Sequence, residues 1–214
     1  MVHNNVSLRK GGLDYIYNIM KIIITEGQYK RLFESEQKVL VLPTISVFGK
    51  GKEGWETLQE FLQSKGNPPF SVNGDVKIEF GNMSLGKLVS VEGDLNMHEY
   101  NIGDLGDLKR VEGNLILWDS YVDSGTLGNL EYVGKNCDLF QCGIKSLGKL
   151  KYVGGTLCLA YSNVKSLGEL KYVGGDLEIY GSKIKKKYSE EEIRSMVDIQ
   201  GSIITEDPEE GVRG

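Results

Sequence analysis

The chain has 214 residues, of which 40% are hydrophobic and 26% are charged, and its formal net charge at pH 7 is −5. This apolar content is sufficient for a folded core, and this length fits one domain or a small domain followed by an array. The acidic balance gives no general attraction to phosphate backbones or anionic membranes, so nucleic acid is not an expected partner.

The first residues are expected to lie outside the main fold. We expect residues 1–19 to be a weakly ordered leader or upstream extension, because Met20-Lys-Ile-Ile-Ile resembles the start of many small phage proteins. The apolar stretch from Tyr15 to Thr25 is interrupted by polar residues and is shorter than the ~20 apolar residues of a membrane span. No membrane anchor is therefore expected.

Residues 20–70 predict a small α/β capping region. Thr25 and Gln28 indicate a capping box for a helix over 26–36, and the β-branched stretch 39–48 predicts a strand or extended segment. A second helix over 52–65 is indicated by apolar residues at helical spacing, which are Trp55, Leu58, Phe61 and Leu62. We expect this helix to cover the first rung of the repeats, because an open strand edge invites aggregation.

The segment Gly49-Lys-Gly-Lys-Glu-Gly54 matches the G-x-G-x-x-G motif of dinucleotide sites and stands between an apolar segment and a helix. The helix is short, and the strand that follows it belongs to the repeats. A flexible glycine-lysine turn is therefore the preferred interpretation, and nucleotide binding through Gly49–Gly54 is an alternative.

From residue 71 to residue 204 the chain repeats the pattern V-x-G-x-L-x-L. The first inward strand residues of six copies follow one another at steps of 19, 20, 22, 20 and 20, and they are Val76, Leu95, Leu115, Cys137, Leu157 and Leu177. Alternating apolar residues predict a short strand with one buried face, and a Leu-Gly-x-Leu step adds a second inward ridge. No rung buries these side chains alone, so the rungs must stack ~4.8 Å apart. The glycines just before the strands, at 74, 93, 113, 155 and 175, are expected to form tight corners with positive φ.

A seventh rung is predicted at the end of the array. Val197-Asp-Ile-Gln-Gly-Ser-Ile-Ile204 aligns with Leu177-Glu-Ile-Tyr-Gly-Ser-Lys-Ile184 at the regular step of the repeat. Ser189 and Glu192 indicate a capping box for a short helix that reaches about Met196. Residues 205–214 are acidic and are expected to be a disordered tail.

These elements predict a mainly β fold, a right-handed β-solenoid of about seven short rungs at 71–204 with an α/β cap. The SLGxLxYVGGxLxI pattern resembles the leucine-rich-repeat-like proteins of phages and bacteria and, more distantly, receptor L domains of the insulin receptor type. The resemblance implies a recognition surface. The chain lacks the cysteine-rich modules of such receptors, which disfavours a receptor ectodomain.

The residues that could carry chemistry are sparse. The three cysteines, Cys137, Cys142 and Cys158, fall at separate phases of the repeat, and their odd number favours reduced thiols in a cytoplasmic protein. With only two histidines, neither a zinc site nor a histidine-based triad is well supplied. We expect no enzymatic activity, no cofactor and no metal.

Two columns of aromatic residues are predicted on the outside of the solenoid. The position after the second inward strand residue carries His98, Trp118, Phe140, Ala160 and Tyr180, with Ile116 beside it. If nothing covers this stripe, it is an apolar surface of the kind that binds a protein partner, and the alternatives are that a neighbouring segment buries it or that the rings simply stack. The second column, a secondary candidate surface, is Tyr132, Tyr152 and Tyr172 with flanking lysines, for which stacking along the solenoid is preferred over a nucleic-acid or glycan site.

The first functional hypothesis is a non-enzymatic interaction module, encoded by a phage or a bacterium, that binds a protein partner in the cytoplasm, of the host if it is phage-encoded. The alternative is a minor virion or assembly component that self-associates through its rungs. The sequence does not fix the oligomeric state, and nucleotide binding is the third hypothesis.

Overall fold

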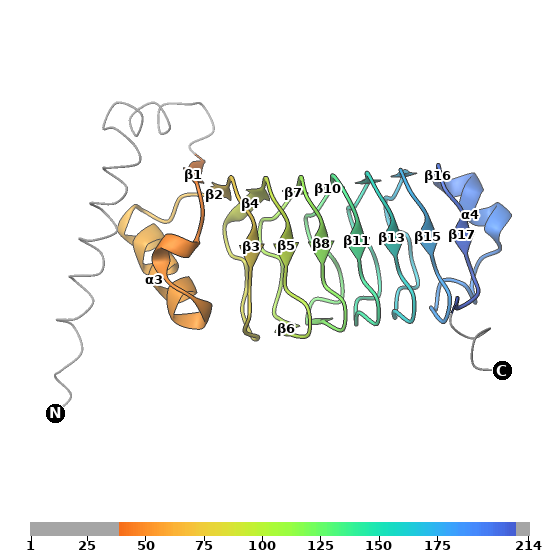
Figure 1. Cartoon of the computed structure of the whole chain (residues 1–214), viewed down its shortest axis with the longest axis horizontal. Helices are drawn as coiled ribbons and strands as arrows, with labels where there is room; N and C mark the ends of the chain where they lie inside the picture. The colour runs from red at the N-terminus through yellow and green to blue at the C-terminus, as the bar shows by residue number, and fades with distance from the viewer. Residues whose placement is uncertain (1–38, 209–214) are drawn as a thin grey trace.

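The computed structural model describes residues 39–208, and this part of the chain is a parallel β-solenoid closed by a helix at each end (Figure 1). The mainly β solenoid predicted from the repeat is thereby confirmed. The predictions of a leader and of a helix over 26–36 lie outside the described residues, as does the predicted disordered tail 205–214 from residue 209 onward. No helix within 39–208 is both long and apolar enough to cross a membrane.

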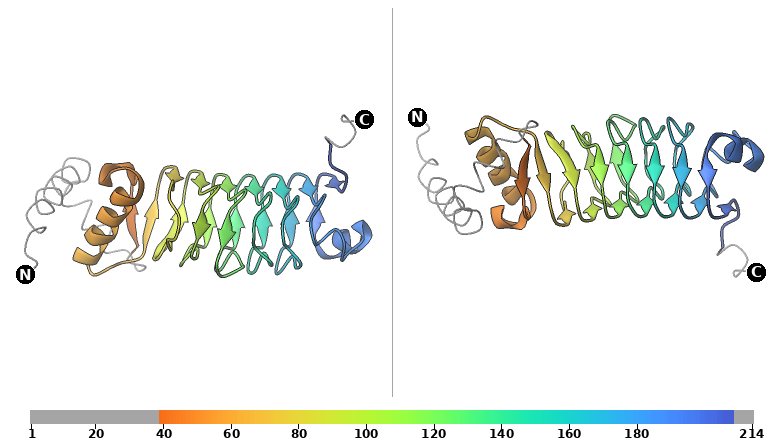
Figure 2. Two further views of the ribbon diagram at one scale, coloured as in Figure 1. Left: turned by 90° about the horizontal axis from the view of Figure 1, so that it is seen from below. Right: turned by 90° about the horizontal axis from the view of Figure 1, so that it is seen from above.

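Each coil contributes one short strand to each of two sheets, which run along the two long sides of the array (Figure 2). The first sheet contains eight strands in the order β1 (Leu40–Leu42), β2 (Phe70–Val72), β4 (Leu88–Val91), β7 (Arg110–Val111), β10 (Tyr132–Val133), β12 (Tyr152–Val153), β14 (Tyr172–Val173) and β16 (Asp198–Ile199). The second sheet contains seven strands in the order β3 (Val76–Lys77), β5 (Leu95–Asn96), β8 (Leu115–Ile116), β11 (Cys137–Asp138), β13 (Leu157–Cys158), β15 (Leu177–Glu178) and β17 (Ile203–Ile204). On a third side, β6 (Asn101–Ile102) pairs with β9 (Tyr121–Val122).

The inward residues of the two sheets form columns that fill the interior. The six predicted inward residues from Val76 to Leu177 are each at most 1% exposed. In the first sheet, Val111, Val133, Val153 and Val173 are fully buried and lie opposite one another in parallel register. The predicted second ridge is also inside, since Leu147 and Leu150 are fully buried. Every coil therefore depends on its neighbours for the burial of its apolar side chains.

A ladder of short polar side chains runs along the corner that leads into the second sheet. The Oδ1 atom of one rung accepts the backbone N–H of the equivalent residue in the next rung, at 2.7–3.1 Å. The first segment consists, in order, of Asp75, Asp94, Asn114, Asn136 and Thr156, and each side chain accepts the N–H of the next residue in this order. In the second segment, Oδ1 of Asp176 accepts the N–H of Ser202. Because Thr156 interrupts the ladder, it has two segments, each of which satisfies corner amides that the sheets leave unpaired.

The ladder also explains the glycines that precede the strands, and the prediction of positive φ at these positions was wrong. Neither Gly113 nor Gly155 is among the residues with positive φ. A Cβ at Gly113 would instead overlap Oδ1 of Asp94, and one at Gly155 would overlap Oδ1 of Asn136. Glycine is required here for the close approach of a neighbouring side chain. Within each rung, the glycine of the Leu-Gly-x-Leu step is one that does have positive φ, such as Gly148 at 60°.

The N-terminal cap is a β-α-β crossover built onto the first sheet. The predicted extended segment contains strand β1 and the 3-10 helix η1 (Ser46–Phe48), and the predicted helix is α3 (Gly51–Ser64). Strand β1 pairs with β2 in parallel register. The four predicted apolar residues of α3 are buried in the core cluster, and Figure 1 shows the helix at the end of the stack. The second sheet has no equivalent of β1, so it ends at β3.

The last rung is present, but the predicted register was wrong. Ile199 pairs with Val173, and Ile203 pairs with Leu177, so Ile199-Gln-Gly-Ser-Ile203 is the copy of the V-x-G-x-L motif. The step from Leu177 to Ile203 is longer than the regular step because helix α4 (Glu190–Met196) is inserted in the connection. The predicted capping box of Ser189 and Glu192 is confirmed.

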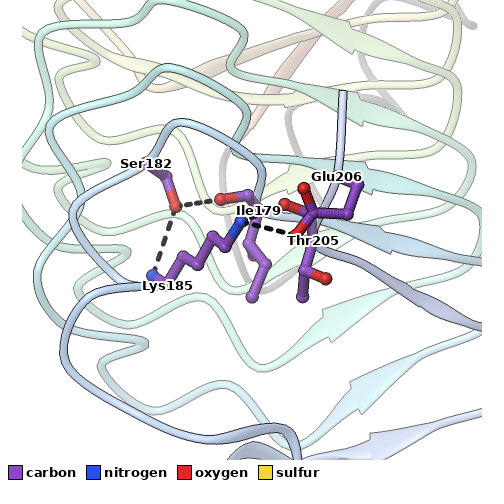
Figure 3. A network of polar contacts seen from close by, with 5 residues as sticks. All are labelled: Ile179, Ser182, Lys185, Thr205 and Glu206. Carbon is purple, nitrogen blue, oxygen red and sulfur yellow. Dashed lines mark hydrogen bonds and ion pairs between the residues drawn. The ribbon is translucent and has the colours of Figure 1, made fainter. Parts of the chain in front are cut away.

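A polar network holds the chain end to the preceding coil (Figure 3). Nζ of Lys185 donates to the carbonyl oxygen of Thr205 at 2.5 Å and lies 3.1 Å from Oε1 of Glu206. Oγ of Ser182 donates to the carbonyl oxygen of Ile179 and lies 3.4 Å from the backbone nitrogen of Lys185. These contacts fix the residues that follow β17, the edge strand of the second sheet.

The ladder gives a stability prediction at Asn136. Asn136→Ala should lower the free energy of unfolding by about 1 kcal/mol, because the N–H of Thr156 loses its acceptor. Asn136→Asp retains an oxygen at the same place and should cost less. Denaturant unfolding followed by circular dichroism measures both variants. Equal losses would show that the side-chain oxygen does not carry the effect.

Candidate binding surface

The predicted aromatic stripe lies on the outward side of the second sheet. We call this surface the aromatic face, defined by the outward residues His98, Ile116, Trp118, Phe140, Tyr161 and Tyr180. Ile116 lies in register with Asn96 and Asp138, so successive rungs place equivalent side chains one above another. Apart from Tyr161, these residues are half-buried. The face is thus neither covered by the coils themselves nor fully exposed.

The rings of the aromatic face form two groups. His98 stacks on Trp118 with a centroid distance of 4.5 Å and an interplanar angle of 7°. Phe140, Tyr161 and Tyr180 form the second group, in which the ring of Tyr161 stands edge-on to both others, at 5.7 and 5.6 Å. The continuous aromatic column expected from the repeat is therefore divided between Trp118 and Phe140.

Tyr161 is the residue of this surface that the repeat pattern did not predict. The column position on its rung is Ala160, which is fully buried, and Tyr161 at the next position has 43% of its surface exposed. Its backbone has φ of 55°, as do the equivalent residues Asp119 and Gln141 at 53° and 52°. The sequence signal that could have predicted Tyr161 is Ala160 itself, a small residue in an aromatic column that is directly followed by an aromatic residue. The hydroxyl of Tyr161 donates to Oδ2 of Asp207 at 2.5 Å, so the chain after β17 reaches this end of the face.

Acidic side chains surround the aromatic rings. The carboxylates in and beside the strand columns belong to Glu79, Glu99, Asp119, Asp138, Glu178, Glu206 and Asp207, and Lys185 at the last rung pairs with Glu206. Lys77 forms an ion pair with Glu79 at 2.5 Å, and this partner lowers the pKa of Glu79. Burial raises the pKa of Tyr180 to about 12, and the negative charges of Glu178 and Asp207 add to the shift. The face therefore combines half-buried rings with an excess of negative charge.

The predicted secondary surface lies on the outward side of the first sheet. Tyr132, Tyr152 and Tyr172 stack with centroid distances of 4.8 Å and near-parallel rings, as the preferred interpretation expected. The guanidinium of Arg110 covers the end of this stack, with its carbon 3.6 Å from the centroid of Tyr132. Lysines flank the stack, and one of them, Lys151, pairs with Glu131 at 2.8 Å. Here the tyrosines already have a cation as their partner.

The three cysteines do not form a reactive site. Cys137 and Cys142 are buried, whereas Cys158 points outward and is partly exposed, as their repeat phases predicted for Cys137 and Cys158. Burial raises the pKa of each thiol, for Cys142 to about 11. A raised thiol pKa lowers the fraction of nucleophilic thiolate at neutral pH.

A cleft of about 280 Å³ lies between η1, the start of α3 and the edge strand β3. Gly49, Gly51 and Gly54 line it together with Asp75 and other residues of this junction. Each glycine has a local structural cause. Gly49 and Gly51 have φ of 116° and 57°, and a Cβ at Gly54 would lie 2.5 Å from the carbonyl carbon of Gly49.

Within residues 39–208, no group of three or more histidine, cysteine, aspartate or glutamate side chains is arranged to hold a metal ion. The chain matches no protein-family model, no curated protein and no solved structure. The fold defines the class of the described part of the chain, which is a parallel β-solenoid.

The thiol environment gives a prediction that depends on pH. A disulfide reagent at about pH 8 should react with Cys137 and Cys142 only after unfolding, because both are buried and protonated. Since the folded state favours the neutral thiols, the free energy of unfolding should fall as pH rises from the unperturbed 9.0 towards 11. Fast labelling of Cys142 in the folded protein, with complete labelling in denaturant as the control, would contradict this environment.

Proposed function

We propose that the protein is a non-enzymatic interaction module that binds a protein partner on the aromatic face. The single observation that carries this proposal is a rigid row of half-buried rings on the outside of a solenoid. Stacked rungs hold these side chains in place before binding, so little conformational entropy is lost when a partner docks. Aromatic residues held in this way are the side chains that most often dominate protein interfaces.

The pattern of local contacts supports the choice of this face over the tyrosine stack. Tyr132, Tyr152 and Tyr172 are stacked on one another, and Arg110 covers the end. On the aromatic face, Trp118 stacks with His98 alone among the ring contacts of the described residues. We further propose a relationship to the leucine-rich-repeat-like proteins of phages and bacteria and a place in the cytoplasm, which rest on the SLGxLxYVGG pattern and on the reduced thiols.

Trp118→Ala tests the proposal. The variant should reduce capture of a partner from lysate of the native host by about tenfold or more, because truncation of a central interface tryptophan commonly costs about 2 kcal/mol or more. Tyr152→Ala on the tyrosine stack is the matched control and should leave capture unchanged. Circular dichroism confirms that both variants fold. Equal capture by the Trp118 variant and the wild type would contradict the proposal.

Self-association of the solenoid as a virion or assembly component is separated from partner binding by light scattering. The interaction-module proposal expects a monomer over a wide concentration range. A mass that rises with concentration, and that Trp118→Ala returns to the monomer, would assign the aromatic face to self-assembly.

A second candidate function, nucleotide binding, is favoured by one observation at the N-terminal cap. Gly49–Gly54 lies in a parallel β-α-β unit, because β1 precedes α3 in the sequence, β2 follows it, and the two strands pair with each other. The strand that follows the helix, β2, therefore belongs both to this unit and to the first sheet of the repeats. Asp75 lines the same cleft. It follows the last glycine of the motif by ~20 residues, which is the spacing at which dinucleotide sites carry an acidic residue.

The nucleotide hypothesis is tested by thermal unfolding with NAD, ADP and ATP. Saturation at 100 times the dissociation constant should stabilise the protein by about 2.7 kcal/mol. Gly51→Ala is the comparison variant, because a Cβ there meets no atom within 4 Å although φ is strained. An unchanged melting temperature with all three nucleotides would leave the motif with its structural role alone.

A further inference from the structure

We propose that the partner of the aromatic face is an extended protein segment that carries arginine side chains, whose guanidinium groups stack on the rings and pair with the surrounding carboxylates. This inference rests on the proposed function and specifies the chemistry of the partner. It follows from three features of the described residues: the sign of the charge on this face, the arrangement of the carboxylates, and an arginine that occupies the equivalent position on the opposite sheet.

The carboxylates lie on the same rungs as the rings. Glu99 and Asp119 directly follow His98 and Trp118, and both are exposed. Asp138 and Glu178 stand two residues before Phe140 and Tyr180 in the outward column of the second sheet. The backbone N–H of Phe140 donates to Oδ1 of Asp138 at 3.0 Å, and burial together with the charge of Glu178 raises the pKa of Tyr180, so a carboxylate lies close to each of these two residues.

The face keeps an excess of negative charge. Beside its columns lie Lys77 and Lys185, and each already pairs with a carboxylate, Glu79 and Glu206 respectively. Opposite charges across an interface steer association and select partners, so this surface favours a cationic segment and repels an acidic one.

Arginine fits these two requirements better than lysine. A guanidinium is planar, stacks on aromatic rings and pairs with carboxylates through two parallel hydrogen bonds. The opposite sheet contains such an arginine within the same chain. The guanidinium carbon of Arg110 lies 3.6 Å from the ring centroid of Tyr132, and Arg110 forms an ion pair with Glu112. The aromatic face has the rings and the carboxylates of this arrangement.

The regular stack also explains why the segment should be extended. Neighbouring rungs lie ~4.8 Å apart, and an extended chain rises about 3.3 Å per residue. Alternate residues of an extended segment along the solenoid axis are about 6.6 Å apart, so three alternate side chains span about 13.2 Å. This is close to the three rung steps, about 14.4 Å, that separate the rungs of Trp118 and Tyr180, so the segment needs no helix or fold to reach both ends of the face.

Fluorescence anisotropy of the full chain with labelled peptides tests the inference. The probe is a short peptide of alternating arginine and serine, and the matched peptides replace arginine with lysine, citrulline or glutamate. We expect the arginine peptide to bind most tightly, the citrulline and glutamate peptides to lose binding, and the affinity to fall between about 50 and 500 mM salt. Trp118→Ala should weaken the arginine peptide about tenfold.

The site is assigned with a pair of variants that remove the same charge. The double variant Asp138→Asn with Glu178→Gln should weaken the arginine peptide about fivefold or more. Glu53→Gln with Glu56→Gln, on α3, removes two charges away from the face and should have little effect. Equal weakening by both double variants, or equal binding of the citrulline peptide, would overturn the inference. The proposed function fails separately, when Trp118→Ala leaves capture of the native partner unchanged.

Discussion

The whole structure depends on the parallel, in-register stacking of one inward column of apolar side chains on the next. A single coil has only two short strands and cannot enclose its own leucines and valines. When Leu115, Cys137, Leu157 and Leu177 pair across neighbouring strands, each closes the interior of the coil on either side. Folding is therefore cooperative between neighbours, and the ends need separate elements, which are α3 at one end and α4 at the other.

The same register determines what the surface presents. Once the inward residues are aligned, the outward residues must also line up, whether or not their contacts contribute to stability. The polar ladder, the tyrosine stack and the aromatic face are three outcomes of one constraint. They differ in the groups that they contact, since the oxygens of the ladder accept backbone N–H groups and the tyrosine stack is covered by Arg110. For the aromatic face, the proposed answer is a cationic partner.

The fold could be predicted to a large extent because its signal is periodic. The inward columns, helix α3 and the capping box of α4 all depend on local spacing, and all were found at the predicted residues. The last register was mispredicted because Val197-Asp-Ile199 imitates a strand motif, while additional chain enters the connection with α4. The glycine corners were assigned the wrong cause, since a close approach from the neighbouring rung leaves no trace in the sequence of one rung. The residues of the face were found by phase, but Tyr161 lay one position outside the column.

The constant spacing in the middle of the array has a consequence for how such a surface can change over time. Cys137, Leu157 and Leu177 are separated by equal lengths of chain and are direct neighbours in the sheet. Duplication or loss of one whole unit by recombination between similar stretches of gene would leave every remaining interior residue beside an equivalent one. The footprint offered to another molecule can thus lengthen or shorten in discrete increments, while the interior and both ends are inherited intact.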